Sequence, residues 1–133
     1  MIYFINNIND FKKILKKDNP IIVNFYAIWC DDCFKINKYI NNNYLNSEYK
    51  NLLFVNIDID NSIEIREYAN INSVPTIQIY NNKKYVCEYI GSSEVQVSYM
   101  LNYGASLYSK QLLYNNKINN NDKINNNDKI NNI

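Results

Sequence analysis

The feature that most constrains the fold is an apolar run that leads into two cysteines three positions apart. Residues 21–27 read Ile-Ile-Val-Asn-Phe-Tyr-Ala, and Asn24 is the lone strongly polar residue among them. Such a run, rich in β-branched and aromatic residues, is typical of a strand that is covered on both faces. Cys30 and Cys33 follow, and apolar residues at helical spacing continue to about Ser47. We therefore expect Cys30 at the start of a helix and Cys33 one turn inside it, where two thiols can form a disulfide and open it again.

The remaining apolar patterns alternate between strands and helices. Strands are expected over residues 2–5, 52–58, 77–80 and 84–90, and helices over residues 9–18, 61–69 and 92–107. The last two strands are joined by a tight turn at Asn81-Asn82, which predicts a hairpin. The order β-α-β-α-β-α-β-β-α indicates an α/β fold, with a central mixed sheet of about five strands and helices on both faces.

The C-terminal segment differs in composition from the rest of the chain. From about Asn115 it repeats Lys-Ile-Asn-Asn-Asn-Asp, so that one isoleucine stands among every six residues. Such a segment cannot bury an apolar face, and it is expected to be disordered. The sequence therefore predicts one folded domain over residues 1–114 and a disordered tail over residues 115–133. An Asn-rich interaction segment is the functional alternative for this tail.

Several classes of function are excluded by composition. The chain has no histidine, which removes Cys-His and Ser-His-Asp nucleophiles and histidine metal sites. The net charge is +1 with both signs interspersed along the chain, so we expect neither a nucleic-acid nor a membrane partner. Residues 1–5 are expected to form a strand and not a signal peptide, and no apolar run reaches 18 residues. We therefore expect a cytoplasmic protein in a reducing compartment.

A second motif lies about forty residues after the cysteines. Val74-Pro75-Thr76 precedes an alternating strand, and Gly91 ends the hairpin. Together with Trp29-Cys30-Asp31-Asp32-Cys33 and with residues 56–60, these segments resemble thioredoxin over residues 2 to about 109. The resemblance implies the thioredoxin fold, a redox-active Cys30–Cys33 disulfide and a cis peptide bond before Pro75, which faces the dithiol.

The resemblance also implies an activity and its partners. Cys30 attacks a substrate disulfide and Cys33 resolves the mixed disulfide, while the Val74 backbone pairs with the substrate and Trp29 forms an apolar wall. The activity is thiol–disulfide oxidoreduction on disulfide-containing proteins or small disulfides. No cofactor is bound, and reducing equivalents come from a dithiol donor, an NADPH-dependent thioredoxin reductase. The protein is expected to be a monomer.

Two departures from the family bear on the chemistry. Asp31-Asp32 replaces the usual Gly-Pro, and a carboxylate about 7 Å from the Cys30 sulfur repels a thiolate by roughly 0.6 kcal/mol in water. We therefore expect a more reducing couple, although the same residues also favour the first turn of a helix. Asn24 replaces a buried aspartate and Asn56 its lysine partner, and an amide cannot accept the proton of Cys33. This predicts a slower release step.

Other functions remain open at this point. A thioredoxin-like binding module would use the groove at Trp29 and Pro75 without turnover. The Trp-Cys-x-Asp-Cys motif also occurs in thioredoxin-related proteins of about 14 kDa, which favour small disulfides. A zinc site would need a fourth ligand beyond Cys30, Cys33 and Cys87, so no metal is expected. Alternation along its strand predicts that Cys87 shares a face with Tyr85 and Tyr89, either as a packed residue or as a regulatory thiol.

Overall fold

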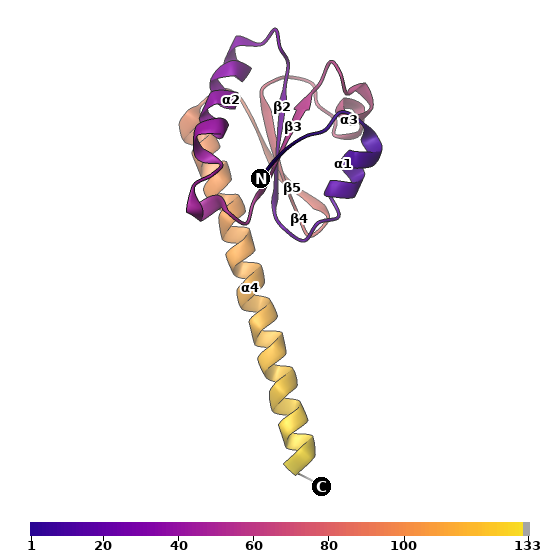
Figure 1. The fold of residues 1–133 in the computed structure, drawn as a ribbon, viewed down its shortest axis with the longest axis vertical. Helices are drawn as coiled ribbons and strands as arrows, with labels where there is room; N and C mark the ends of the chain where they lie inside the picture. The colour runs from indigo at the N-terminus through magenta and orange to yellow at the C-terminus, as the bar shows by residue number, and fades with distance from the viewer. Residues whose placement is uncertain (132–133) are drawn as a thin grey trace.

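The computed structural model describes residues 1–131 and shows a five-stranded sheet between helices (Figure 1). Its strands are β1 (Ile2–Phe4), β2 (Ile21–Tyr26), β3 (Leu53–Asp58), β4 (Thr76–Asn81) and β5 (Lys84–Ile90). They lie in the order β1-β3-β2-β4-β5, with β1, β3 and β2 parallel and β4 and β5 antiparallel to their neighbours. This confirms the mixed sheet and the order of elements that the sequence predicts.

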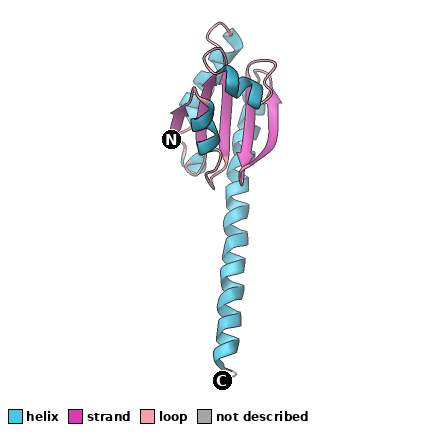
Figure 2. Cartoon of the chain, turned by 90° about the vertical axis from the view of Figure 1, so that its right-hand side faces the viewer, coloured by secondary structure: helices cyan, strands magenta, loops and turns pink. Residues whose placement is uncertain are grey.

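Two helices cover each face of the sheet (Figure 2). The helices are α1 (Ile8–Ile14), α2 (Asp31–Asn43), α3 (Ile63–Tyr68) and α4 (Glu94–Asn131), with a short 3₁₀ turn at Ser47–Tyr49. Helices α1 and α3 contribute Phe11, Ile14 and Ile65 to the core on one face. Helices α2 and α4 contribute their apolar residues to the core on the other face, and these are Ile36, Ile40, Val97 and Leu101.

The central strands are apolar on both faces because both faces are covered. Alternate residues of β2 divide between the two cores, with Val23 and Phe25 under α1 and α3 and Ile22 under α2 and α4. Each of these side chains is completely buried. The apolar run of the sequence therefore corresponds to a strand between two helical layers.

The strand register brings distant segments to one edge of the sheet. Tyr26 lies beside Asp58 in the parallel pair, and Phe25 lies beside Thr76 in the antiparallel pair. The segment after β2, the segment after β3 and the loop before β4 consequently meet at this edge. Both motifs recognised in the sequence stand there.

The predicted arrangement of the hairpin is wrong at one residue. The pairing of β4 with β5 shifts between Ile79 and Tyr80, so that Ile79 faces Cys87 and Tyr80 faces Tyr85. Cys87 packs with Tyr89 against the core under α2 and α4. The Tyr85 ring instead contacts, edge to face, the ring of Tyr80, which belongs to the core under α1 and α3, and the two ring centroids lie 6.0 Å apart. The bulge inserts one residue, which moves Tyr85 to the opposite face of the sheet.

The C-terminal segment also differs from the expectation. The structure continues α4 as a helix to Asn131, where the sequence predicts disorder, and the helix projects away from the sheet (Figures 1 and 2). Helix propagation from a packed first half needs no new nucleus, which explains how a segment without an apolar face can be helical. Residues 112–124 are exposed throughout. The final two residues of the predicted tail lie outside the described part of the chain, and within residues 1–131 no helix combines the length and apolarity needed to cross a membrane.

Candidate active site

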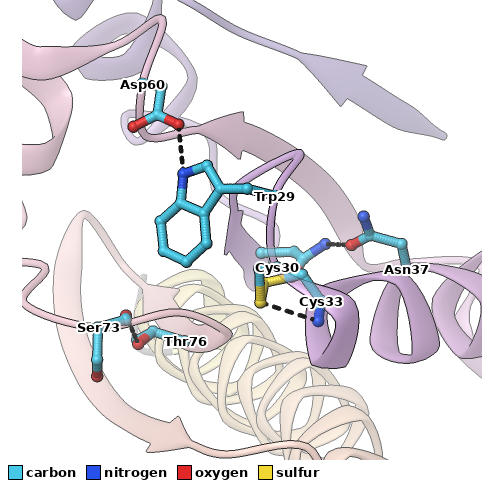
Figure 3. Close-up of a disulfide and its surroundings, with 8 residues drawn as sticks. Trp29, Cys30, Cys33, Asn37, Asp60, Ser73 and Thr76 are labelled. Carbon is cyan, nitrogen blue, oxygen red and sulfur yellow. Dashed lines mark hydrogen bonds between the residues drawn. A yellow bond between two sulfur atoms is a disulfide. The ribbon is translucent and has the colours of Figure 1, made fainter.

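The disulfide lies at the first turn of α2 (Figure 3). Cys30 is the N-cap residue of this helix, and its sulfur accepts a hydrogen bond of 3.1 Å from the backbone N–H of Cys33. The two cysteines are bonded to each other, with their Cα atoms 5.2 Å apart. The expected disulfide pairing is thereby confirmed. Because backbone N–H groups converge at a helix N-terminus, a negative charge on the Cys30 sulfur is favoured there.

The two sulfur-bearing residues differ in access to solvent. Cys33 is 1 % exposed and belongs to the core, whereas Cys30 is only partly buried. A substrate can therefore reach Cys30 and cannot reach Cys33 without movement of the helix.

Trp29 forms one side of the site. Its side chain is 69 % exposed, and its Nε1 donates a 2.8 Å hydrogen bond to Oδ2 of Asp60 (Figure 3). Asp60 belongs to the segment after β3, so this bond joins two of the three segments that meet at the sheet edge. The indole ring is thus held in place while its face remains open to a partner.

The loop before β4 forms another side. The Val74–Pro75 peptide bond is cis, as the resemblance implies, and Val74 packs against the same core cluster as Cys30. The Thr76 hydroxyl donates to the Ser73 carbonyl at 2.7 Å, which ties the two ends of the loop together (Figure 3). The loop therefore shares one core cluster with Cys30, and its residues Ser73 and Thr76 lie on the same side of the sheet end as Trp29 and the disulfide (Figure 3).

Gly91 supports this loop from β5. Its N–H donates a 3.2 Å hydrogen bond to the Pro75 carbonyl, and its φ is +148°, which L side chains rarely adopt. A Cβ at this position would lie 2.6 Å from the Tyr89 hydroxyl. The same hydroxyl accepts a hydrogen bond from the Ser93 N–H. A glycine is therefore required where the chain passes behind Pro75.

Asp31 and Asp32 occupy the first turn of α2 and are both exposed. Carboxylates at this position interact favourably with the positive end of the helix. They also lie next to Cys30 in the chain, where they oppose the formation of a thiolate. The structure supports both effects that the sequence suggests.

A cluster of three amides, two of them buried, lies next to Cys33 in the fold. Asn24 is 2 % exposed, and its Nδ2 donates to Oδ1 of Asn37 at 2.6 Å and to Oδ1 of Asn56 at 3.0 Å. Its own Oδ1 is buried without a hydrogen-bond partner. Asn56 faces Asn24 across the β2–β3 pair, and Asn37 stands one turn after Cys33 on α2 (Figure 3). Sequence reasoning identifies Asn24 and Asn56 but misses Asn37, which its spacing of four residues from Cys33 could have revealed.

The third cysteine lies apart from the disulfide. Cys87 is on β5, where it is partly buried against the core under α2 and α4, and this burial raises the pKa of its thiol. A raised pKa keeps a thiol protonated and unreactive. Among the described residues, no group of three His, Cys, Asp or Glu side chains is placed to hold a metal ion.

Comparison with known proteins identifies the family. The family model for thioredoxin matches residues 3–102. Thioredoxin from Ictalurus punctatus is 29% identical over 104 residues, which cover 77% of this chain and 97% of the relative. Thioredoxin from Coprinus comatus is 29% identical over 93 residues, covering 70% of this chain and 88% of the relative.

Solved structures agree with this assignment. The solution structure of oxidised thioredoxin from Plasmodium falciparum has a TM-score of 0.71 at 25% identity, covering 79% of this chain and 99% of the other. The crystal structure of thioredoxin from Malassezia sympodialis shares the fold, with a TM-score of 0.75 at 18% identity, and covers 78% of this chain and 93% of the other. The family model, the fold and the Cys30–Cys33 disulfide all agree. This chain belongs to the thioredoxin family, and it is a thiol–disulfide oxidoreductase.

Proposed function

We propose that Cys30 is the attacking nucleophile and Cys33 the resolving thiol in the reduction of substrate disulfides. The Cys30 thiolate attacks one sulfur of the substrate, forming a mixed disulfide and releasing the other sulfur as a thiolate. Cys33 then loses its proton and attacks the Cys30 sulfur. This step closes the Cys30–Cys33 disulfide and releases the second substrate thiol, so that two electrons pass from the protein to the substrate.

One observation carries this assignment of roles. Cys30 is only partly buried and its sulfur accepts the Cys33 N–H at a helix N-terminus, whereas Cys33 is 1 % exposed. Nucleophilic attack requires a thiolate that a substrate can approach. Resolution requires only that the second sulfur lies within bonding distance of the first, which a buried residue one helical turn away satisfies.

The surrounding residues supply a place for the substrate. Trp29 and the loop containing Val74, Pro75 and Thr76 flank the disulfide on different sides, and the Val74 backbone is suited to pair with an extended peptide. Gly91 holds the loop in position. The substrates are therefore disulfide-containing proteins or small disulfides, bound by a monomer.

Turnover requires that the disulfide be reduced again. We propose a dithiol donor for this step, with NADPH and a thioredoxin reductase as the source of electrons and no cofactor bound to the chain itself. A reducing compartment such as the cytoplasm would sustain the cycle. Family membership supports this scheme.

The roles of the two cysteines are tested by separate serine substitutions. In an insulin-reduction assay driven first by dithiothreitol and then by NADPH with thioredoxin reductase, Cys30→Ser is expected to abolish reduction above the background. Cys33→Ser is expected to trap a mixed disulfide through Cys30, visible as an added mass that dithiothreitol removes. Trapping through Cys33 in the Cys30→Ser variant would reverse the assignment, and Cys87→Ser serves as the control that should retain activity.

A further inference from the structure

Charges that are mixed along the sequence are separated in space. Asp31 and Asp32 follow β2 and Asp58 and Asp60 lie at the end of β3, and the parallel register of these strands brings all four carboxylates to the edge that carries the disulfide. The opposite edge is mostly basic: lysines lie there before β2, before β3 and in the β4–β5 turn, and they outnumber the two carboxylates of Asp18 and Glu48. These lysines are Lys16, Lys17, Lys50, Lys83 and Lys84. The net charge of +1 conceals this separation.

The hydrogen bonds of two of these carboxylates come from neutral donors. Asp60 accepts from the indole N–H of Trp29, and Asp58 accepts from the Asp60 backbone N–H and the Asn61 side-chain amide. None of these donors brings a positive charge to the site. The negative potential at this end of the molecule is therefore not cancelled by the contacts that hold it together.

Two cations come nearest to this end. Lys35 stands one turn after Asp31 on α2, and Arg66 is partly buried on α3 with its Nε donating to the Ile71 carbonyl at 3.3 Å. The four carboxylates outnumber them. The sheet edge that carries the disulfide is therefore acidic overall, and the Asp31-Asp32 pair that the sequence shows is only part of that charge.

Large apolar side chains are exposed beside the same disulfide. Ile28 is 83%, Phe34 73% and Trp29 69% exposed, and all three lie next to the Cys30–Cys33 pair in the chain. Apolar groups of this size lose their contact with water only when a partner covers them. The site thus combines an apolar surface with an acidic surround.

We infer that this end of the molecule selects disulfides flanked by apolar and basic residues, with Asp31 and Asp32 as specificity-determining residues. The inference rests on the proposed function of the Cys30–Cys33 pair and names its substrate class. Acidic residues around the disulfide attract a basic segment before contact, and the lysines at the opposite edge orient the molecule so that its disulfide end leads. The same field repels acidic segments.

The size of the effect follows from Coulomb's law. Two unit charges about 10 Å apart in water change a rate roughly twofold. A peptide with two lysines in place of two glutamates changes several such pairs, so we expect a preference of roughly tenfold at low salt. At about 0.5 M salt, screening acts over roughly 4 Å and should remove most of the preference.

The test uses two synthetic peptides that share one disulfide loop and one flanking leucine but carry either two lysines or two glutamates. The full-length protein is reduced with dithiothreitol, freed of it, and mixed with each peptide in a stopped-flow instrument. The single tryptophan, Trp29, stands beside Cys30 and reports the reaction by its fluorescence. The second-order rate constant should be about tenfold higher for the lysine peptide, and the ratio should fall towards one in high salt.

Variants separate the local field from other causes. The double variant Asp31→Asn/Asp32→Asn should reduce the ratio several-fold, whereas Asp18→Asn, which lies before β2 at the opposite edge, should leave it unchanged. A ratio near one in the wild type, or an unchanged ratio in the double variant, would overturn the inference. Reduction of the neutral 2-hydroxyethyl disulfide tests the proposed function separately from the selectivity. A protein that cannot reduce this uncharged compound would contradict the proposed function, whereas one that reduces it but shows no preference between the peptides would contradict only the selectivity.

Discussion

At the scale of single residues, the amide of Asn24 determines which groups can handle the proton of Cys33. Its Nδ2 is committed to Asn37 and Asn56, and its Oδ1 is buried without a donor. A neutral amide is not a base at any pH relevant to the reaction. The proton of Cys33 must therefore pass to water, to Asp32 or to the departing substrate thiolate.

Substitution of Asn24→Asp tests this explanation. A carboxylate at this position can act as a general base, so release of the second substrate thiol should become faster, on the order of tenfold or more. Attack by Cys30 should be little changed. Single-turnover kinetics followed by the fluorescence of Trp29 separate the two steps, and an unchanged release rate would remove the amide as the cause of slow turnover.

The same substitution should lower stability. A buried carboxylate without a cation lowers the free energy of unfolding by several kcal/mol. In the wild type Asn37 and Asn56 turn their side-chain oxygens towards residue 24, and these oxygens would repel a carboxylate there. Both amides would have to rotate to donate hydrogen bonds. Adding Asn56→Lys as a second substitution should recover part of the lost thermal midpoint, because it supplies the missing positive charge.

At the scale of elements, the first turn of α2 combines two opposed electrostatic effects on Cys30. The helix N-terminus favours a thiolate by about 0.3–1 kcal/mol. Each neighbouring carboxylate opposes it by roughly 0.6 kcal/mol when water separates the charges. Asp31 and Asp32 together therefore match or exceed the contribution of the helix.

The double variant Asp31→Asn/Asp32→Asn should consequently have a less negative reduction potential. Removing about 1.2 kcal/mol of repulsion from the reduced thiolate corresponds to roughly 25 mV for a two-electron couple, when Cys30 is ionised. Equilibration with glutathione buffers at alkaline pH measures the shift. Lys38→Gln, which removes an exposed positive charge farther along α2, is a control for general surface effects. A potential that stays constant or becomes more negative would contradict the balance of charges argued here.

The elements themselves show what sequence patterns can and cannot predict. The strand before Cys30 is predictable because a continuous apolar run needs cover on both faces. The placement of Tyr85 is not, since a single inserted residue in the β4–β5 pair reverses the alternation without any glycine or proline to mark it. Asn37 is predictable only in part, because its spacing from Cys33 puts both residues on one face of α2, whereas its contact with Asn24 depends on how α2 lies across the sheet.

At the scale of the whole molecule, the charge separation is a property of topology. Asp31 and Asp58 are far apart in the sequence and come together only because β2 and β3 are parallel and adjacent. Lys83 is separated from Asp60 by a similar length of chain but lies at the other edge, since β4 runs antiparallel to β2. Positive and negative residues are interspersed along the sequence, but this order does not predict how charge is distributed over the folded surface.

The C-terminal half of α4 tests where the domain ends. Residues 112–124 are exposed, whereas Val97 and Leu101 of the same helix are completely buried. We propose that residues 1–114 fold and act alone, so deletion of residues 115–133 should leave both the thermal midpoint and insulin reduction unchanged. Leu101→Ala should instead lower the midpoint by roughly 10 °C or more, because a cavity in the core costs about 2–5 kcal/mol. The exposed side chains of residues 112–124 support no core, which is why we expect the deletion to be neutral. A truncated protein with a lower thermal midpoint, or one that reduces insulin more slowly, would show instead that the distal helix contributes to the domain.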